Sequence, residues 1–282
     1  MRLPAQLLKR KPDTHKGSYG HVLVLGGSPG LTGAVCLCGQ AALRSGAGMI
    51  TAGVPSSLNH IFECKLTEIM SLPLPDRQGY LSSRGFKQAK DFADKADVVV
   101  VGGGASCNLS ARNFILKVVR HIEKPLIIDA DGLNALAGNP DYLMKRASEN
   151  VIITPHPKEF SRLTKKSVSE IKQNRKELAK KFALRYNLTL VLKGNHTIIT
   201  NGKSCFENST GNPGLATAGT GDVLCGIIAG LLVQNLNTLD AARLGVYIHG
   251  LAADTAVKDK TQVCLIASDL IEYLPGVFKK FR

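Results

Sequence analysis

Residues 211–235 read GNPGLATAGTGDVLCGIIAGLLVQN and combine a glycine-rich loop with an apolar segment. In the apolar segment, valine, leucine and isoleucine recur at helical spacing, so we predict a helix that begins at about Asp222. Gly226 and Gly230 are four residues apart and leave one side of this helix flat, where another backbone can approach. The stretch therefore predicts a glycine-rich loop that leads directly into a buried helix.

The start of such a helix is a favourable place for a phosphate group. Its first backbone N–H groups have no partner within the helix, and the aligned peptide dipoles add partial positive charge there. Glycines permit the positive φ angles that turn several amides toward one anion. The loop 218–222, with sequence AGTGD, therefore predicts an anion-binding site.

Asp222 lies at this helix start, and its carboxylate has two interpretations. Aspartate is a preferred N-cap residue, so Asp222 could simply cap the helix. Alternatively, it is a general base that takes a proton from a hydroxyl group attacking a phosphorus held by the neighbouring amides. Short glycine patterns also occur without function, so the loop alone leaves both interpretations open.

Composition favours one soluble domain with anionic partners. The 282 residues show no linker, repeat or change of composition, so we predict a single domain over residues 1–282. The formal charge of +14 favours nucleotides or phosphorylated metabolites. Much of this charge lies in residues 158–185 at a spacing typical of solvated helix faces, so a basic surface is the simpler explanation for it. Nucleic acid is not an expected partner, because tryptophan is absent and no zinc-finger or RNA-binding signature is present.

Cysteine usage and hydropathy predict a cytoplasmic location. The seven cysteines are odd in number and form no CxxC pair, which indicates reduced thiols. The first twelve residues lack the apolar core of a signal peptide. The longest apolar run, residues 223–233, is too short to span a bilayer, so we expect no membrane association.

Apolar strands alternate with helices along most of the chain. We predict strands at residues 21–25, 49–54, 97–101, 125–129, 151–154 and 189–192. We predict helices at residues 31–45, 83–95, 169–185, 239–257 and 267–281. This alternation is typical of an α/β fold with a mainly parallel sheet covered on both faces. Asn201-Gly202 between two short β segments predicts an antiparallel hairpin at the sheet edge.

Three consecutive predicted strands end in glycine-rich or polar turns, at residues 102–104, 129–134 and 155–159. Ligands of open α/β sheets bind at the carboxyl ends of the strands, so we expect these turns to converge. Asp131 is interpreted as the cap of the helix that follows it. His156 lies between two prolines that fix its turn, which favours a binding role.

Glu159 and Lys193 are further candidates at strand ends. Glu159 begins a helix, where it is either a first-turn charge or holds a water on a phosphate-bound magnesium ion. Lys193-Gly194 offers a cation and an approachable backbone, and this turn leads through the hairpin to the loop 211–222. The turn and the loop are therefore expected to share a ligand.

The first strand is followed by GGSPGLTGA, which does not fit the G-x-G-x-x-G fingerprint. No acidic residue ends the next strand, so a Rossmann-type NAD site is not predicted here. Gly33 and Ala34 instead offer a small-residue surface for a flat ligand, and close helix–strand packing is the alternative explanation.

Six segments together resemble a known family. They occur in order and at the expected distances: KGSYGHVLVLGGSPGLTGA, ADVVVVGGG, LIIDADGLNAL, TPHPKEF, VLKGNHT and GNPGLATAGTGDVL. The chain resembles the NAD(P)H-hydrate dehydratases of the ribokinase-like fold over almost its whole length. The resemblance implies a three-layer αβα architecture and repair of NADH or NADPH whose nicotinamide ring carries an added hydroxyl group. Members phosphorylate this hydroxyl with ADP or ATP, and the phosphate is then expelled.

The resemblance also implies roles for individual residues. Asp222 matches the catalytic base, which also contacts the hydrated cofactor. The residues that match the adenine-nucleotide site and its anion hole are Lys193, Gly194, Asn195, His196, Thr197, Gly219, Thr220 and Gly221. The residues that match contacts to the hydrated cofactor are Ala34, Gly102, Gly104 and His156.

Further expectations concern partners. The resemblance implies Mg²⁺, a homotetramer, and a separate epimerase, because the epimerase domain fused to some members is missing from this sequence. A ribokinase-like kinase for a vitamin precursor or sugar would share the GTGD loop and the base, and is the alternative. A non-catalytic nucleotide sensor is a third possibility, but it would be expected to lack the Asp222 carboxylate.

Overall fold

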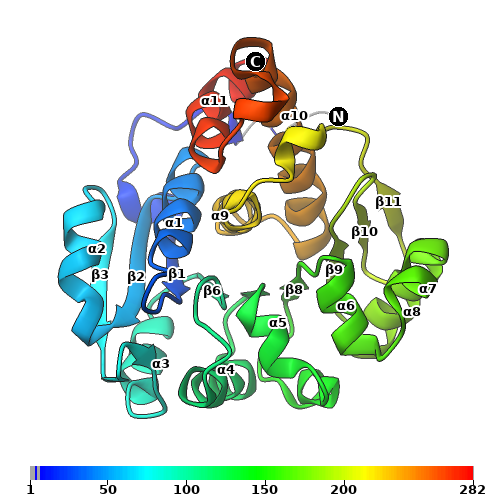
Figure 1. The fold of residues 1–282 in the computed structure, drawn as a ribbon. Helices are drawn as coiled ribbons and strands as arrows, with labels where there is room; N and C mark the ends of the chain where they lie inside the picture. Colours follow the sequence, from blue (N-terminus) through cyan, green and yellow to red (C-terminus); the bar gives the residue numbers. More distant parts are fainter. Residues whose placement is uncertain (1–3, 5–6, 282) are drawn as a thin grey trace.

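A central sheet with helices on both faces forms the body of the molecule (Figure 1). The computed structural model describes residue 4 and residues 7–281. Within them the nine-stranded sheet has the order β11-β10-β9-β8-β7-β6-β1-β2-β3. Its strands are β1 (His21–Leu25), β2 (Met49–Pro55), β3 (Met70–Leu74), β6 (Val98–Val101), β7 (Leu126–Ile128), β8 (Val151–Ile153), β9 (Thr189–Leu192), β10 (Ile198–Thr200) and β11 (Cys205–Glu207).

The pairing of the strands confirms the predicted sheet. All pairs from β3 to β9 are parallel, and β10 and β11 add antiparallel pairs at one edge. Asn201 and Gly202 lie in the β10–β11 turn, and the Asn201 side chain accepts hydrogen bonds from the Lys203 and Ser204 amides. The Asn-Gly prediction of an antiparallel edge hairpin is therefore confirmed.

Both faces of the sheet are buried, and alternate residues of a strand enter different cores. In β6, Val98 and Val100 join one hydrophobic cluster, while Val99 and Val101 join the other. This division follows from the two-residue period of a strand and explains why β6 is a continuous run of valine.

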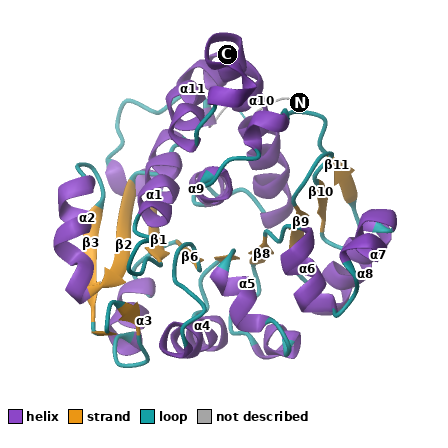
Figure 2. Cartoon of the chain, viewed as in Figure 1, coloured by secondary structure: helices purple, strands orange, loops and turns teal. Residues whose placement is uncertain are grey.

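Helices from separate parts of the chain cover the two faces (Figure 2). One face is covered by α1 (Gly33–Arg44), α2 (Asn59–Lys65), α9 (Thr220–Leu232), α10 (Thr238–Cys264) and α11 (Ala267–Lys279). The other is covered by α3 (Phe86–Ala93), α4 (Leu109–His121), α5 (Asp131–Leu136), α6 (Pro157–Thr164), α7 (Val168–Gln173) and α8 (Arg175–Tyr186). Short 3₁₀ turns are η2 (Lys16–Tyr19), η3 (Ser56–Leu58), η4 (Pro140–Lys145) and η5 (Pro213–Leu215). The observed three-layer α/β architecture agrees with the prediction.

Several elements were not predicted from the sequence. They are α2, β3, α4 and the small hairpin of β4 (Asp76–Arg77) and β5 (Tyr80–Leu81). No helix within residues 7–281 is long and apolar enough to cross a membrane. Residues 1–3 and 5–6, which belong to the segment without a predicted signal peptide, lie outside the described residues.

The glycine-rich side of α9 packs directly on α1, as the four-residue spacing predicted. A Cβ atom on Gly226 would lie 2.1 Å from the Cys38 carbonyl oxygen, and one on Gly230 would lie 2.6 Å from that of Ala42. Both contacts are shorter than a side chain allows. The two glycines therefore set the distance between α1 and α9, and with it the position of the loop before α9.

We expect Gly226→Ala to destabilise the protein by about 1–3 kcal/mol, because the added methyl group forces α1 and α9 apart. Urea unfolding followed by circular dichroism measures this loss. Gly276→Ala is the matched control, since a Cβ there has no heavy atom within 4 Å and alanine favours the helix. Equal stabilities of the two variants would contradict the close packing.

Candidate active site

The carboxyl ends of β6, β7 and β8 lie side by side, and the start of α9 faces them. A Cβ built on Gly103 would lie 2.9 Å from Asp222 Oδ1. A Cβ on Gly221 would lie 3.5 Å from Lys193 Nζ and 3.9 Å from Asp129 Oδ2. The structure therefore brings the GTGD loop, the glycine turn after β6, the end of β7 and the turn after β9 together.

Asp222 is not the N-cap of α9, so the capping interpretation is wrong. The cap position belongs to Gly219, whose φ of 87° suits glycine, and the helix begins at Thr220, two residues earlier than predicted. The Asp222 carboxylate lies in the first turn of α9, next to the glycine turn of β6.

The surroundings of Asp222 suit a general base. Burial raises the pKa of its carboxyl group to about 7, with a further contribution from the negative charge of Asp129 and an opposing one from Lys193. A base is most effective when its pKa lies near the working pH. A strongly shifted carboxyl group in a ligand-binding cleft is a typical property of a functional site.

A buried ion pair lies beneath this carboxylate. Lys193 Nζ is 2.8 Å from Asp129 Oδ1, and the Thr154 hydroxyl donates to the same oxygen at 2.7 Å. Although burial opposes charge on both groups, Lys193 lowers the pKa of Asp129, and the carboxylates of Asp129 and Glu159 raise the pKa of Lys193. The pair is therefore charged, and it fixes a positive group beside Gly221.

No role was predicted for Thr154. At most one of Asp129 and Asp131 was expected to face a ligand, and Asp131 was expected to cap the helix that follows. In the structure Ala130 is the N-cap, with φ of 49°, and the Asp131 carboxylate instead accepts a hydrogen bond from the Ser106 amide at 2.7 Å. The capping prediction for Asp131 is wrong, because the positive φ moves the helix start back by one residue.

His156 and Glu159 form a reciprocal cap at the start of α6. His156 Nδ1 accepts hydrogen bonds from the Lys158 and Glu159 amides, and Glu159 Oε2 accepts one from the His156 amide at 2.8 Å. This capping role of the imidazole was missed, although an acidic residue three positions after the cap was a signal for it. The second ring nitrogen, Nε2, lies 3.4 Å from Glu159 Oε1.

Glu159 is oriented by these contacts and buried to 6% exposure. Burial raises the pKa of its carboxyl group, and the nearby Lys193, 3.9 Å away, opposes the shift. Oε2 of Glu159 accepts the hydrogen bond from the His156 amide, and Oε1 lies near the His156 ring. Of its two predicted roles, the first-turn charge is confirmed, and a contact with magnesium through water stays a prediction.

Arg175 holds the turn that the sequence predicted as a nucleotide site. Its guanidinium donates to the Asn195 carbonyl oxygen and, at 3.2 Å, to that of Leu192. A Cβ on Gly194, whose φ is 130°, would lie 3.4 Å from the same group. Arg175 was not predicted, because it comes from a helix 18 residues earlier in the chain.

The remaining residues of this turn point in different directions. The Thr197 hydroxyl donates to the Gly194 carbonyl oxygen at 2.9 Å, which closes the turn. His196 has a positive φ of 54°, and its Nδ1 lies 3.3 Å from Glu207 Oε1. The Thr197 hydroxyl is thus engaged within the turn, while the half-exposed His196 ring faces the edge strand β11.

Two predicted positions act through the backbone. The Thr220 hydroxyl donates to the carbonyl oxygens of Leu215 and Thr217, at 2.9 and 3.0 Å, so its side chain faces its own loop. Gly102 is buried, and a Cβ there would lie 2.1 Å from the Asp129 carbonyl oxygen. Gly102 therefore lets β6 and β7 approach, and Gly103, one residue later, faces Asp222.

Ala34 and Gly104 lie together, as the resemblance implied for one binding surface. A Cβ on Gly104 would lie 3.2 Å from the Ala34 methyl group and 2.4 Å from the Leu31 carbonyl oxygen. The Ser28 hydroxyl also donates to the Gly104 carbonyl oxygen at 2.8 Å. The loop after β1 and the turn after β6 thus form one continuous wall next to Asp222.

The residues do not form a metal site of their own. Within residues 7–281, no group of three or more histidine, cysteine, aspartate or glutamate side chains is placed to hold a metal ion. Mg²⁺ commonly keeps several waters and binds through one or two carboxylates together with substrate phosphates. Glu159, in the first turn of α6 and 3.9 Å from Lys193, is the carboxylate predicted to take part in such binding.

Comparison with known proteins identifies the family of this chain. A family model described as NAD(P)H-hydrate dehydratase matches residues 22–276. The chain belongs to this family. The ADP-dependent (S)-NAD(P)H-hydrate dehydratase of Neisseria meningitidis is 34% identical over 259 residues, which cover 90% of this chain and 83% of that protein.

Bifunctional members of the family are longer. The bifunctional NAD(P)H-hydrate repair enzyme Nnr of Moorella thermoacetica is 41% identical over 281 residues, which cover 99% of this chain and 53% of that protein. The chain thus spans about half the length of such relatives.

Solved structures agree with the family and the fold. The ADP/ATP-dependent NAD(P)H-hydrate dehydratase of Bacillus subtilis, co-crystallised with ATP and Mg²⁺, has a TM-score of 0.83 and 34% identity, covering 99% of this chain and 95% of that one. Arabidopsis thaliana ribokinase, at 12% identity and a TM-score of 0.52, shares the fold alone. The predicted ribokinase-like fold is confirmed.

Proposed function

We propose that this protein restores hydrated NADH or NADPH to the active cofactor, with ADP or ATP as phosphate donor. The observation that carries the proposal is the placement of Asp222, whose carboxyl group has a pKa raised to about 7 and which lies between the glycine turn of β6 and the first amides of α9. The names of the Neisseria and Bacillus relatives support the same reaction.

The first step is transfer of a phosphoryl group. The ring hydroxyl of the hydrated cofactor attacks the terminal phosphorus of the nucleotide, and Asp222 accepts the hydroxyl proton. The bond from that phosphorus to the rest of the nucleotide breaks, which releases AMP from ADP or ADP from ATP. The amides of Gly219 and Gly221 and the ammonium of Lys193 stabilise the negative charge that develops on the phosphoryl oxygens.

The second step is elimination. The lone pair of the ring nitrogen expels phosphate from the neighbouring carbon, and a proton then leaves the adjacent ring carbon. A double bond forms between these two ring carbons, which restores the dihydronicotinamide. Ala34, Gly103 and Gly104 lie together beside Asp222 and present no large side chain, so the ring would lie against them in both steps.

Magnesium fits this site as a companion of the nucleotide. When bound, Mg²⁺ supplies positive charge to the phosphate oxygens. Glu159 is the residue that would hold it, through water, so the Asp222 carboxylate remains available to accept the hydroxyl proton. The ion pair with Asp129 holds the Lys193 ammonium in place beside Gly221, where it meets the phosphoryl group.

A ribokinase-like kinase is the competing function, and the acceptor site distinguishes the two. Such a kinase would release a stable phosphorylated product. The Moorella, Neisseria and Bacillus relatives named above bear dehydratase or hydrate-repair names, whereas the ribokinase similarity concerns the fold alone. The dehydratase is therefore the better supported function.

The deciding experiment follows the recovery of NADH absorbance when the purified protein and Mg²⁺ are mixed with hydrated NADH. Parallel reactions contain ADP, ATP or no nucleotide, and released phosphate is measured in each. Recovery with one nucleotide and an equal amount of phosphate would establish the reaction and its donor. Consumption of nucleotide with another hydroxylated acceptor, without recovery of NADH, would establish the kinase instead.

We expect the rate of dehydration to depend on pH through Asp222. The base acts only when it is ionised, so kcat/KM should rise with pH and level off above about 7, the value to which burial raises the pKa of this group. An initial-rate profile from pH 5 to pH 9, with saturating nucleotide, measures this. A profile that is flat between pH 5 and pH 8 would contradict the assignment of the base.

Several features of the whole protein remain part of the proposal. We place it in the cytoplasm as a single-domain homotetramer without nucleic-acid partners, and size-exclusion chromatography with light scattering tests the tetramer. Bifunctional relatives combine repair activities in one chain. If only the S form of the hydrate is a substrate, a separate epimerase supplies it from the R form.

A further inference from the structure

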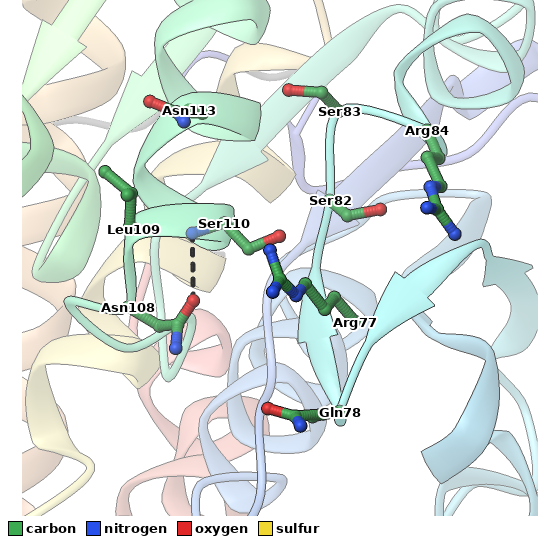
Figure 3. Close-up of a pocket in the computed structure, with 9 residues that line it drawn as sticks. All are labelled: Arg77, Gln78, Ser82, Ser83, Arg84, Asn108, Leu109, Ser110 and Asn113. Carbon is green, nitrogen blue, oxygen red and sulfur yellow. Dashed lines mark hydrogen bonds between the residues drawn. The ribbon is translucent and has the colours of Figure 1, made fainter.

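A cavity of about 790 Å³ lies beside the acceptor wall and outside the residues assigned so far (Figure 3). One of its sides is the β4–β5 hairpin and the segment after it, which contribute Arg77, Ser82 and Arg84. The opposite side is the start of α4, which contributes Asn108, Ser110 and Asn113. Its volume is in the range of pockets that bind small molecules and cofactors.

The cavity is positively charged. Arg77 and Arg84 are its only charged lining residues, and no carboxylate lines it. Within residues 7–281, neither guanidinium takes part in an ion pair. The Arg77 side chain points across the cavity toward Ser110 (Figure 3). Guanidinium groups bind phosphate oxygens in a bidentate manner, so these two residues favour a phosphate ligand.

The hairpin that carries Arg77 is held in place by its neighbour Asp76. The Asp76 carboxylate accepts hydrogen bonds from the Ser56 hydroxyl, the Ser57 hydroxyl and amide, and the Gly79 amide, at 2.7–3.0 Å. These bonds lower the pKa of the Asp76 carboxyl group despite the opposing effect of burial. The Asp76 carboxylate is thus bonded to η3 and to its own turn and forms no ion pair with Arg77, whose charge stays available to a ligand.

The cavity adjoins the acceptor side of the active site. Only four residue steps separate Gly104 in the acceptor wall from Asn108 in the cavity, a span of at most about 14 Å. Gly79 of the hairpin lies against Pro29 of the loop after β1, since its Cβ would be 2.7 Å from Pro29 Cγ. The same loop contacts Gly104 through Ser28.

The cavity lies on the side away from the predicted nucleotide turn. That turn follows β9, whereas the cavity lies between the end of β6 and the hairpin that follows β3. In the sheet, β8 and β7 separate β9 from β6. A ligand group in the cavity therefore belongs to the acceptor and not to the phosphate donor.

We propose that this cavity binds the adenosine half of the hydrated dinucleotide, and that Arg77, which points toward Ser110, binds the 2′-phosphate that distinguishes NADPH from NADH, while Arg84 adds positive charge at another side of the cavity. The proposal rests on the proposed function for the placement of the ring at Asp222. A dinucleotide whose ring lies at Gly103 must extend its second nucleotide away from the donor, and this cavity lies in that direction. The chain is therefore expected to prefer hydrated NADPH.

A binding experiment tests the cavity without the reaction. The full chain is saturated with a non-hydrolysable ATP analogue and Mg²⁺ to occupy the donor site, and is then titrated by calorimetry with adenosine 2′,5′-bisphosphate or with 5′-AMP. We expect the bisphosphate to bind at least tenfold more tightly than 5′-AMP. Arg77→Gln together with Arg84→Gln should remove this difference, and each single substitution should reduce it.

Arg120→Gln is the matched control, because it removes the same charge from an exposed position at the far end of α4. It should leave the binding of the bisphosphate unchanged. Both arginines of the cavity are exposed, so the variants are expected to fold, and thermal melting verifies this. Wild-type protein that binds both ligands equally, or a double variant that keeps the preference, would overturn the proposal.

Kinetics then connect the cavity with the substrate. In the double variant, KM for hydrated NADPH should rise at least tenfold with kcat within a factor of two, while KM for hydrated NADH changes little. An equal rise for both substrates would overturn the assignment of the 2′-phosphate. The wild-type protein could repair neither substrate while the double variant still loses the preference for the bisphosphate. That result would refute the proposed function but not the cavity as a phosphate site.

Discussion

Replacing Asp222 by asparagine is expected to lower kcat for dehydration by a factor of about 10²–10⁴, the usual contribution of a general base. Asparagine keeps the shape of the side chain but cannot accept the hydroxyl proton. Because the carboxylate is not part of the α9 cap, the loop amides should keep their positions. Nucleotide affinity, measured by calorimetry, should therefore stay within a few-fold of the wild-type value, and NADH recovery measures the lost turnover.

The same variant should be more stable than the wild type at neutral and higher pH. Burial raises the pKa of Asp222 from 3.8 to about 7, so the folded state binds a proton that the unfolded chain has already released. Wild-type stability therefore falls between pH 4 and pH 7, by at most about 4 kcal/mol at 1.36 kcal/mol per pKa unit. The free energy of unfolding of Asp222→Asn should not decrease in this way between pH 4 and pH 7.

Asp91→Asn is the control for both measurements, because it removes an exposed carboxylate from α3 without touching the site. It should change neither turnover nor the pH dependence of stability. Wild-type turnover in Asp222→Asn would refute the role of the base. Lost turnover together with lost nucleotide binding would instead indicate that the loop has collapsed.

The positions of the parallel strands were largely predictable, because buried parallel strands have a simple signature. The bounds of β1 and β9 agree with the predicted residues, and both are continuous apolar segments next to a glycine or polar turn. The edge strand β3 was missed. Its sequence MSLPL contains a proline, and only Leu74 is buried, so it lacks both the alternation and the continuous hydrophobicity of a strand.

Helix α4 was missed although its sequence carries the signal. Ala111, Phe114, Ile115 and Val118 recur at helical spacing, and the Asn108 side chain caps the first turn by accepting from the Ser110 amide. The start of α9 was placed two residues late, because Asp222 is a good cap residue by type. The left-handed φ of Gly219, which moves the cap to that position, cannot be read from local propensity.

Within the site, local sequence predicted which turns meet but not which side chains pair. The carboxyl ends of neighbouring parallel strands must lie together, so the convergence of the turns after β6, β7 and β8 follows from the pattern alone. The contact between Asp129 and Lys193 joins residues 64 positions apart and depends on β8 lying between β7 and β9. Sequence spacing contains no information about such a pair.

This pair should be the most important polar contact for stability. Lys193→Met leaves Asp129 as an uncompensated buried charge, and we expect it to destabilise the protein by about 3–5 kcal/mol. Asp129→Asn should cost less, because Glu159 remains 3.9 Å from the Lys193 ammonium. Urea unfolding at pH 7.5 measures these values. The exposed pair Lys90–Asp94, with a similar distance of 2.9 Å, is the control and should contribute little, because water screens it.

The double variant, Asp129→Asn with Lys193→Met, distinguishes two contributions to the free energy of unfolding. One is the attraction between the two charges, and the other is the cost of leaving one buried charge without its partner. With both charges gone, the loss should be well below the sum of the two single losses, by at least about 2 kcal/mol, because neither variant side chain is ionised. Additive losses would mean that the two residues stabilise the fold independently. The pair would then matter for its position beside Gly221 and not for stability. Turnover of the double variant, measured under conditions in which it is fully folded, tests that role directly.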